Sequence, residues 1–390
     1  MTKPVRMNAF VMNTVAHQSP GLWRHPRDRS GAYNQLQHWT STGYELPIAF
    51  ARRMSTLDHL TEGRVAWNIV TGYLNSAAKG RGAAQIEGHD DRYAIAEEFT
   101  DVVYKLWEAS WDEDAVKRSK ATGTFTDPEA VHKITHDGTF FQLDAMAVSE
   151  PSPQRTPVLF QAGASPKGRD FAARHAECVF IAGPSPQVIA PWVADIRARA
   201  RAMGRDPADI LIFAEITVIP GATDADAQAK LKDYQTYIDP DGALAMVGGL
   251  TGVDFTEIGW DDPIEYVENN ALRSHLEAIT TADPGKVWTK RSLAAYAGIG
   301  GIAPVITGDA GTCADALLGF MEATDVDGFN LAYAVWPESF EDFIASVVPE
   351  LQARGRYRTD YAPGTMRDKL WGKGARLSPP HPAALTRETT

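Results

Sequence analysis

The chain has 390 residues, of which 44% are hydrophobic and 23% are charged. This composition is that of a globular protein with enough apolar material for a large core, and it excludes disordered and collagen-like classes. The 50 acidic residues outnumber the 38 basic ones, which gives a net charge of -12. Such a balance argues against a surface built to bind the phosphates of DNA or RNA, so we expect no nucleic-acid partner.

Cysteine content and hydropathy bear on where the protein works. The two cysteines, Cys178 and Cys313, belong to no metal-binding or redox motif, so we expect reduced thiols and no structural metal. No stretch is apolar for long enough to span a membrane, and the first ten residues lack the apolar segment of a signal peptide. We therefore expect a cytoplasmic protein with no membrane partner.

In chain order, short apolar segments alternate with segments of helical periodicity, which predicts βα units and a parallel sheet. Strands this continuously apolar are typical of a sheet covered on both faces. The predicted strands are Arg6–Asn13, Val65–Thr71, Pro157–Ala162, Cys178–Ala182, Ile210–Ile219 and Gly328–Ala334. Apolar residues at three- and four-residue steps predict the helices Pro47–Leu60, Asp91–Glu108 with Asp91 as its cap, Lys167–His175, Pro186–Met203 and Glu341–Arg354.

Two longer stretches do not follow this alternation: Ser110–Ser152, rich in Thr, Asp and Pro, and the glycine-containing Asp239–Gly308. Segments of this length are usually functional loops or carry small elements of their own. We therefore expect two insertions over the mouth of one α/β barrel domain that comprises residues 1–390. The Pro and Thr content of Leu377–Thr390 predicts a poorly ordered terminus or a surface arm.

A polar cluster follows the second predicted strand, where Asn68, Thr71, Gly72 and Tyr73 stand at its carboxyl end. In a parallel barrel the carboxyl ends of the strands form the active-site face. Gly72 permits close approach of the backbone to a planar ligand, and Tyr73 offers an aromatic face with a hydroxyl. An ordinary βα turn would contain the same residues, so a purely structural role stays open.

A second cluster, Gly163, Ala164 and Ser165, lies between a predicted strand and the start of a predicted helix. Free backbone N–H groups and the helix dipole attract a phosphate at such a position, and small residues let it approach. Ser165 can donate its hydroxyl. Many βα turns contain glycine for geometry alone, so this pattern is not specific by itself.

Histidine provides the third set of candidates. His17 follows the first predicted strand and should lie near the barrel mouth, and His89 precedes Tyr93 by one helical turn on the same face. A histidine taken singly is more often a hydrogen-bonded structural residue. No HExxH or two-His-one-carboxylate pattern predicts a metal, and the nucleophile elbow, P-loop and GxGxxG turn are absent, which disfavours serine hydrolases, P-loop NTPases and Rossmann dehydrogenases.

Taken together, these residues resemble the bacterial luciferase-like, flavin-dependent monooxygenases, in the branch that contains nitrilotriacetate, dibenzothiophene sulfone and long-chain alkane monooxygenases. The resemblance covers most of the chain. The matching stretches include SPGLWRHP, YELPIAFARRMSTLDHLTEGRVAWNIVTGYLNSAA, HDDRYAIAEEFTDVVYKLWE and SPQRTPVLFQAGASPKGRDFAARHAECVF.

The resemblance implies a TIM-type barrel and a monooxygenase that uses reduced FMN (FMNH2) and O2. Such an enzyme inserts one oxygen atom through a flavin C4a-hydroperoxide into an organic molecule, a class that includes sulfur- and nitrogen-containing compounds. It implies a separate NAD(P)H:flavin reductase as partner, and we expect a homo-oligomer, either dimer or tetramer. Carried over by position, the wall beside the isoalloxazine is formed by Asn68, Gly72 and Tyr73. The ribityl and phosphate partners are His89 and Tyr93, the phosphate-binding turn is Gly163, Ala164 and Ser165, and the candidate catalytic residue is His17.

The resemblance is interrupted between Thr40 and Ser41. The family continues there for roughly 70 further residues that include two strands of an eight-stranded barrel. We therefore expect an incomplete barrel with about six of the eight strands. A catalytically impaired flavin-binding or partner-binding remnant is the alternative to an active monooxygenase, and hydride transfer with a deazaflavin is disfavoured because the matches belong to the FMN branch.

Overall fold

The computed structural model describes residues 3–11, 16, 18–30, 46–72, 75–80, 82, 84–266 and 271–388, without the side chains of 75–77 and 388. Two of the predicted site residues, His17 and Tyr73, lie outside the described residues, as does the junction between Thr40 and Ser41. Their predicted roles therefore stay predictions.

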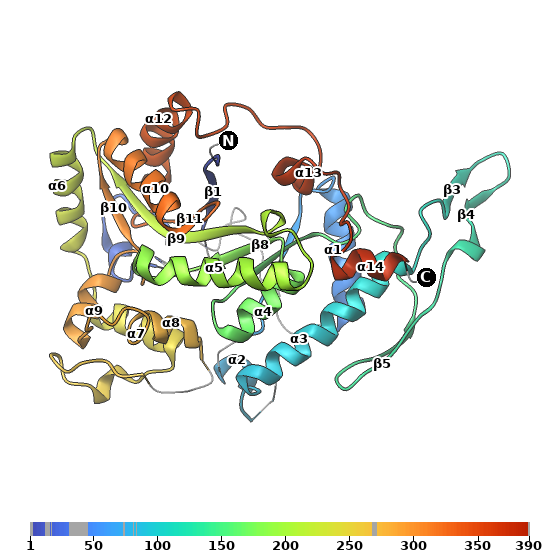
Figure 1. Ribbon diagram of the computed structural model, residues 1–390, viewed down its shortest axis with the longest axis horizontal. Helices are drawn as coiled ribbons and strands as arrows, with labels where there is room; N and C mark the ends of the chain where they lie inside the picture. The colour runs from blue at the N-terminus through green and yellow to red at the C-terminus, as the bar shows by residue number, and fades with distance from the viewer. Residues whose placement is uncertain are drawn as a thin grey trace.

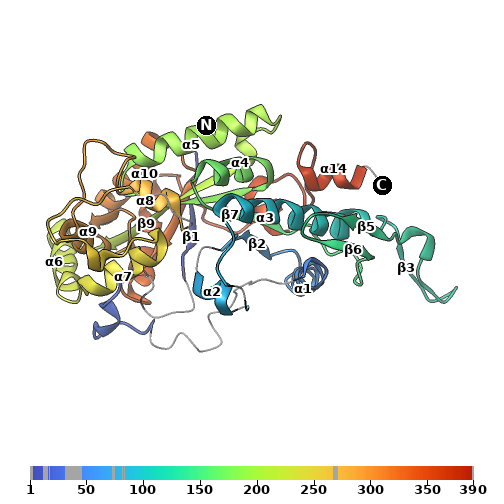
Figure 2. The same cartoon turned by 90° about the horizontal axis from the view of Figure 1, so that it is seen from below.

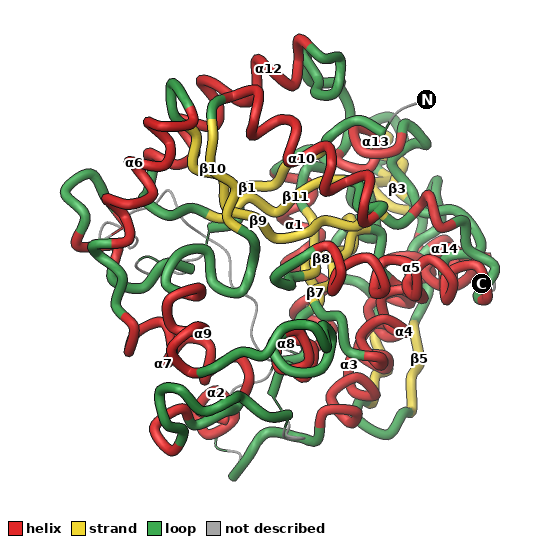
Figure 3. The backbone as a smooth tube through the Cα atoms, turned by 60° about the vertical axis from the view of Figure 1, so that its left-hand side comes forward, coloured by secondary structure: helices red, strands yellow, loops and turns green. Residues whose placement is uncertain are grey.

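A curled parallel sheet forms the centre of the molecule, with helices around it (Figure 3). Its strands follow the order β1 (Arg6–Ala9), β11 (Gly328–Ala332), β9 (Leu211–Pro220), β8 (Cys178–Ile181), β7 (Val158–Ala162) and β2 (Ala66–Ile69). All six predicted strands are confirmed. A seventh, β10 (Val305–Gly308), pairs with the carboxyl end of β9. It is not among the predicted strands because its four residues lie inside a stretch that the sequence assigns to an insertion.

The sheet does not close into a complete barrel. β1 pairs with β11 and β2 pairs with β7, and within the described residues no pairing joins β1 to β2. Each of these two strands is therefore an edge of the sheet, whereas a complete barrel of this type has eight strands and no edges. The molecule is an incomplete barrel, as the interruption between Thr40 and Ser41 predicts.

Side chains alternate between the two faces of the sheet along each strand, and helices cover the apolar side chains of the outer face. On β9, Ile212, Ala214, Ile216 and Val218 point outward into the main hydrophobic core, which also contains residues of α5 (Pro186–Ala202) and α10 (Ala310–Thr324). Leu211 and Phe213 point the other way and pack with residues of the neighbouring strands. Figure 1 shows α5 lying across β8 and β9, with α4 (Pro166–His175) beside it. The predicted helix Pro47–Leu60 is α1.

The predicted helix Asp91–Glu108 begins earlier than the sequence indicates. Helix α3 comprises His89–Tyr104 and continues as a π-helical turn over Lys105–Ala109. Its N-cap is Gly88, which provides no side-chain cap, so the prediction that Asp91 is the cap is wrong. Asp91 lies instead in the first turn, where its carboxylate favourably meets the positive end of the helix dipole.

The remaining helices lie between or beyond these units, and none of the described helices is both long and apolar enough to cross a membrane. They are α2 (Asn75–Gly80), α6 (Asp224–Gln235), α7 (Pro240–Thr251), α8 (Arg273–Ala278), α9 (Lys290–Ala297), α11 (Glu338–Asp342), α12 (Val348–Ala353), α13 (Met366–Trp371) and α14 (Pro382–Glu388). Helices α7, α8 and α9 and strand β10 all lie within the second stretch predicted as an insertion.

The first predicted insertion does not cover the sheet. It forms two antiparallel hairpins, β3 (Val116–Ser119) with β4 (Thr124–Thr126) and β5 (Ile134–Asp137) with β6 (Gln142–Ala145). Figures 1 and 2 show that the hairpins extend away from the sheet, at the end of the molecule opposite α6. The expectation that this stretch lies over the barrel mouth is wrong.

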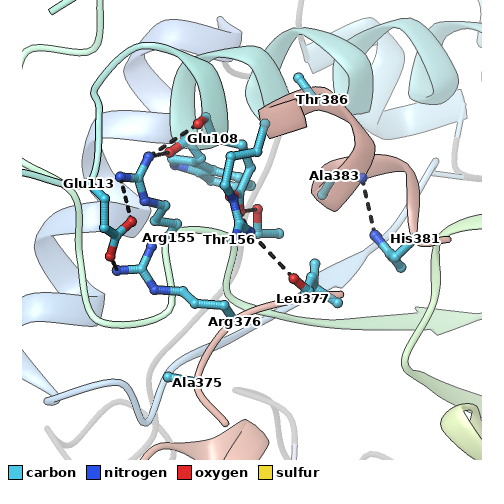
Figure 4. A network of polar contacts seen from close by, with 12 residues as sticks. Glu108, Glu113, Arg155, Thr156, Ala375, Arg376, Leu377, His381, Ala383 and Thr386 are labelled. Carbon is cyan, nitrogen blue, oxygen red and sulfur yellow. Dashed lines mark hydrogen bonds and ion pairs between the residues drawn. The ribbon is translucent and has the colours of Figure 1, made fainter. Parts of the chain in front are cut away.

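Of the two alternatives predicted for the tail, the poorly ordered terminus is wrong and the surface arm is confirmed. Leu377 and two alanines of α14 are buried in the cluster that contains the apolar side chains of α1 and α3. Arg387 contacts the fully buried carboxylate of Glu108 at 2.7 Å, and Arg376 contacts Glu113 at 3.1 Å (Figure 4). The tail is therefore a docked arm. Its apolar side chains pack against α1 and α3, and its cationic side chains form ion pairs with acidic residues that follow α3.

Candidate active site

The connection between β7 and α4 is a tight turn of small residues. Gly163 has φ +141°, a conformation that residues with side chains rarely adopt, and its N–H donates to the carbonyl of Phe180 on β8 at 3.3 Å. Ser165 is the N-cap of α4, and its Oγ accepts a hydrogen bond from the N–H of Gly168 at 3.1 Å. The positive end of the α4 dipole therefore lies at this turn.

Helix α3 supplies two side chains to the same turn. His89 and Tyr93 are both buried, with ring centroids 5.4 Å apart, and the Tyr93 hydroxyl lies beside Ser165. A Cβ atom on Gly168 would lie 2.7 Å from the Tyr93 oxygen, so glycine at this position lets Tyr93 approach α4. The structure thus brings together five predicted site residues from two elements that lie about 70 positions apart in the sequence, namely His89, Tyr93, Gly163, Ala164 and Ser165.

The electrostatics around this turn favour an anion. Burial lowers the pKa of His89, so its ring is neutral near pH 7, although Nδ1 lies 2.7 Å from the Asp90 carboxylate. The hydrogen bond with His89 lowers the pKa of Asp90, and the positive charges of Arg273 and Lys167 lower it further. Lys167 is in the first turn of α4 and Arg273 opens α8, so cations from two further positions act on this corner.

The sequence reasoning did not identify these two cations. Lys167 follows Ser165 by two positions, and its place in the first turn of a predicted helix is a signal that could have identified it. Arg273 lies within the stretch predicted as an insertion, more than 100 residues from the turn in the sequence, and no local pattern marks it.

The inner face of the sheet beside the turn is lined by small or polar side chains. On β2, Trp67 and Ile69 pack outward with α1 and α3, which leaves Asn68 exposed on the inner face. Ala162 of β7 is also exposed on that face, and Gly72 follows β2 with φ +79°. Small residues therefore stand at the carboxyl ends of β2 and β7, and the assignment of Asn68 and Gly72 to the wall beside a flat ring stays a prediction.

These residues fit FMN. Two buried hydroxyls, a helix N-terminus and nearby cations suit a phosphate monoester, and the glycines at 163 and 168 allow the close approaches that this turn contains. Among the residues that the structure describes, no group of three or more histidine, cysteine or acidic side chains could hold a metal ion.

A residue of a different kind was also missed. Glu215 is the one charged residue in the apolar strand β9, and it lies on the inner face with Leu211 and Phe213. The near-continuously apolar segment ILIFAEITVI, which predicts this strand, contains Glu215. A lone acidic residue in a buried strand is a signal that could have identified it.

The fold and the cluster around α4 define an α/β-barrel protein with an anion-suited corner at the carboxyl ends of its strands. Residues 40–328 match the family model described as luciferase-like monooxygenase. The dimethyl-sulfide monooxygenase of Hyphomicrobium sulfonivorans is 41% identical over 454 aligned positions, which cover 100% of this chain and 95% of the relative. Component A of the nitrilotriacetate monooxygenase of Aminobacter aminovorans is 34% identical, over 85% of this chain and 73% of the relative.

The fold likeness extends to solved structures. The crystal structure of a riboflavin lyase with modified FMN and riboflavin has a TM-score of 0.89 and 29% identity, with 99% of this chain and 100% of the other covered. This chain therefore belongs to the luciferase-like monooxygenase family, and its enzyme class is that of a flavin-dependent monooxygenase.

The comparison also bears on the missing segment. The 454 aligned positions exceed the 390 residues of this chain by 64, so the dimethyl-sulfide monooxygenase contains at least that many positions without a counterpart here. This difference agrees in size with the omission expected between Thr40 and Ser41, and it agrees with a sheet that is open between β1 and β2.

Proposed function

We propose that this protein is an FMNH2-dependent monooxygenase that inserts one oxygen atom of O2 into an organic substrate containing sulfur or nitrogen. The observation that carries the proposal is the corner where Ser165 and Tyr93 meet at the N-terminus of α4 beside Lys167 and Arg273. The substrates named for the two relatives, dimethyl sulfide and nitrilotriacetate, support the choice of heteroatom.

In this proposal the residues of one 390-residue domain have separate tasks. The turn Gly163–Ser165 holds the FMN phosphate, His89 and Tyr93 hydrogen-bond the ribityl and phosphate groups, and Asn68, Gly72 and Tyr73 form the wall beside the ring. Bound reduced flavin supplies the oxygen-activating chemistry. His17 provides or orients a proton at the reacting end.

The proposal includes a partner. A component A in a relative's name supports a two-component system, in which a separate NAD(P)H:flavin reductase supplies reduced FMN. A homo-oligomer and a cytoplasmic location stay predictions. Nothing in the described part of the chain favours the alternative of a catalytically impaired remnant.

The variant Ser165→Asp tests the phosphate position, because it sets a negative charge against the phosphate while an aspartate can still cap α4. We expect the affinity for FMN to fall at least about tenfold, which corresponds to about 1.4 kcal/mol. The affinity for riboflavin, which has no phosphate, should not change. Anaerobic titrations of reduced FMN and of riboflavin, followed by flavin fluorescence or absorbance, measure both.

Ser165→Asn is the matched control, since asparagine has the shape of aspartate and also caps helices but carries no charge. Equal FMN affinity in the Asp and Asn variants would place the phosphate elsewhere. In a second arm, His17→Ala should lower turnover more than flavin affinity. An equal loss of both would mark His17 as a binding or folding residue.

A further inference from the structure

Three polar side chains lie side by side on the inner face of the open sheet. Asn8 of β1 pairs in register with Asn330 of β11, and Asn330 pairs with Glu215 of β9. Their sequence neighbours Met7, Phe329, Leu331 and Ala214 belong to or pack against the outer core. Because side chains on paired strands point the same way and neighbouring strands lie about 4.8 Å apart, the three form a continuous polar row across three strands.

Two residues of this row are buried, Asn8 is half-buried, and the hydrogen bonding of the row is incomplete. Asn330 and Glu215 are only 5% and 9% exposed. The Asn8 amide nitrogen and one Glu215 carboxyl oxygen are buried without a hydrogen-bond partner, as is the hydroxyl of Thr217, two residues further along the same face of β9. Leaving a buried polar atom unpaired costs free energy, and native structures contain few such atoms. Three of them together indicate a ligand that pairs with them.

Among the residues that the structure describes, the strand neighbours of Glu215 provide no counter-charge. Asn330 and Asn8 lie across the strands, and Phe213 and Thr217 lie along β9. Burial alone raises the pKa of Glu215 to about 8. The carboxyl therefore holds its proton near pH 7 and can donate a hydrogen bond.

The row lies between the two ends of the proposed site. The turn Gly163–Ser165 follows β7, which is two strands from β9 on one side, and the predicted catalytic residue His17 follows β1, which is two strands away on the other. A ligand that extends from the turn along the inner face toward β1 must cross the row.

We propose that Glu215, Asn330 and Asn8 form a binding site for an uncharged hydrogen-bonding group of the ligand at the reacting end of the pocket. This inference rests on the proposed function and adds to it a preference for neutral hydrogen-bonding groups in the ligand. Neutral donors and acceptors match a carbonyl, amide, sulfoxide or imide-like edge, whereas a carboxylate would face an acid that must stay protonated. The group belongs either to the organic substrate or to the polar edge of the flavin ring.

Two variants separate these sources. Glu215→Leu and Asn330→Leu each remove hydrogen-bonding atoms at similar volume. If the flavin edge occupies the row, both variants should weaken binding of riboflavin and of FMN at least tenfold in anaerobic titrations. If the substrate occupies it, flavin affinity should be unchanged and the KM for a neutral sulfide, sulfone or amide should rise at least tenfold.

Glu215→Gln is the conservative control, because it keeps a donor and an acceptor but does not titrate in this range. It should bind as the wild type does near pH 7. Above pH 8 the wild-type chain should lose ligand affinity as Glu215 ionises, while the Gln variant should not. Thermal unfolding of each leucine variant shows whether it folds. If the leucine variants do not fold, the comparison of the wild type with Glu215→Gln still tests the proposal.

The row would be purely structural if the folded leucine variants matched the wild type in flavin affinity and in KM. The proposal would also be overturned if the wild type and Glu215→Gln showed the same dependence of ligand affinity on pH. Neither result requires the proposed function to be wrong. A wild-type chain that binds no flavin and consumes no oxygen with any substrate would instead overturn the proposed function itself.

Discussion

Replacing Glu215 by glutamine should stabilise the folded protein in a way that depends on pH. Burial raises the pKa of Glu215 from 4.5 to about 8 in the folded chain, whereas the unfolded chain has the ordinary value. Between these two pH values the folded state retains a proton that the unfolded state has released. The stability of the wild type therefore falls as pH rises through this range, and it levels off above it.

The magnitude follows from the size of this interval. Each pH unit between 4.5 and about 8 costs the wild-type fold about 1.4 kcal/mol. The cost is below about 1 kcal/mol at pH 5, reaches about 3 kcal/mol at pH 7, and approaches about 5 kcal/mol above pH 8. Glutamine has nearly the same shape and does not titrate, so the variant should lack this cost.

Urea unfolding of both flavin-free chains at pH 5, 6, 7 and 8, at constant ionic strength and followed by tryptophan fluorescence, measures the difference. Glu257→Gln makes the same chemical change at an exposed site and is the control for the substitution itself. If the free-energy gap between the wild type and Glu215→Gln stays constant from pH 5 to pH 8, Glu215 does not hold its proton and the reasoning fails.

Two further variants test other parts of the fold. Arg367 and Glu177 form a buried ion pair at 2.7 Å, so Arg367→Met should lower the free energy of unfolding by about 3–5 kcal/mol by leaving a buried carboxylate unpaired. The double variant Arg367→Met, Glu177→Leu should recover much of this loss in urea unfolding, and no recovery would contradict the account. Arg387→Ala should remove the ion pair with buried Glu108 and expose the C-terminal arm to limited proteolysis, whereas Arg376→Ala, whose partner Glu113 is exposed, should change the cleavage rate little.

Local sequence determined the elements and one part of the candidate site. Apolar periodicity predicts α1 within one residue of its observed ends, and it identifies six strands of the sheet. The order of small residues and a serine between a strand and a helix predicts the turn at Gly163–Ser165. These features depend on neighbours in the sequence, whose spacing fixes which face of an element is apolar and where a helix can start.

Contacts between distant segments were decided by the tertiary structure. Four residues are too few to mark β10 as a strand until β9 pairs with them, and the C-terminal arm is ordered because buried Glu108 meets Arg387. The positive charge of Arg273 lowers the pKa of His89, and this effect depends on where α8 packs.

The polar row shows the same division most clearly. The sequence contains Asn8, Glu215 and Asn330 at positions more than 100 residues apart. The two asparagines are ordinary residues of predicted strands, and the lone acid Glu215 does not by itself indicate which side chains lie beside it. Their adjacency follows from the strand order and the pairing register, because a shift of one residue in either pairing would turn a side chain to the opposite face of the sheet.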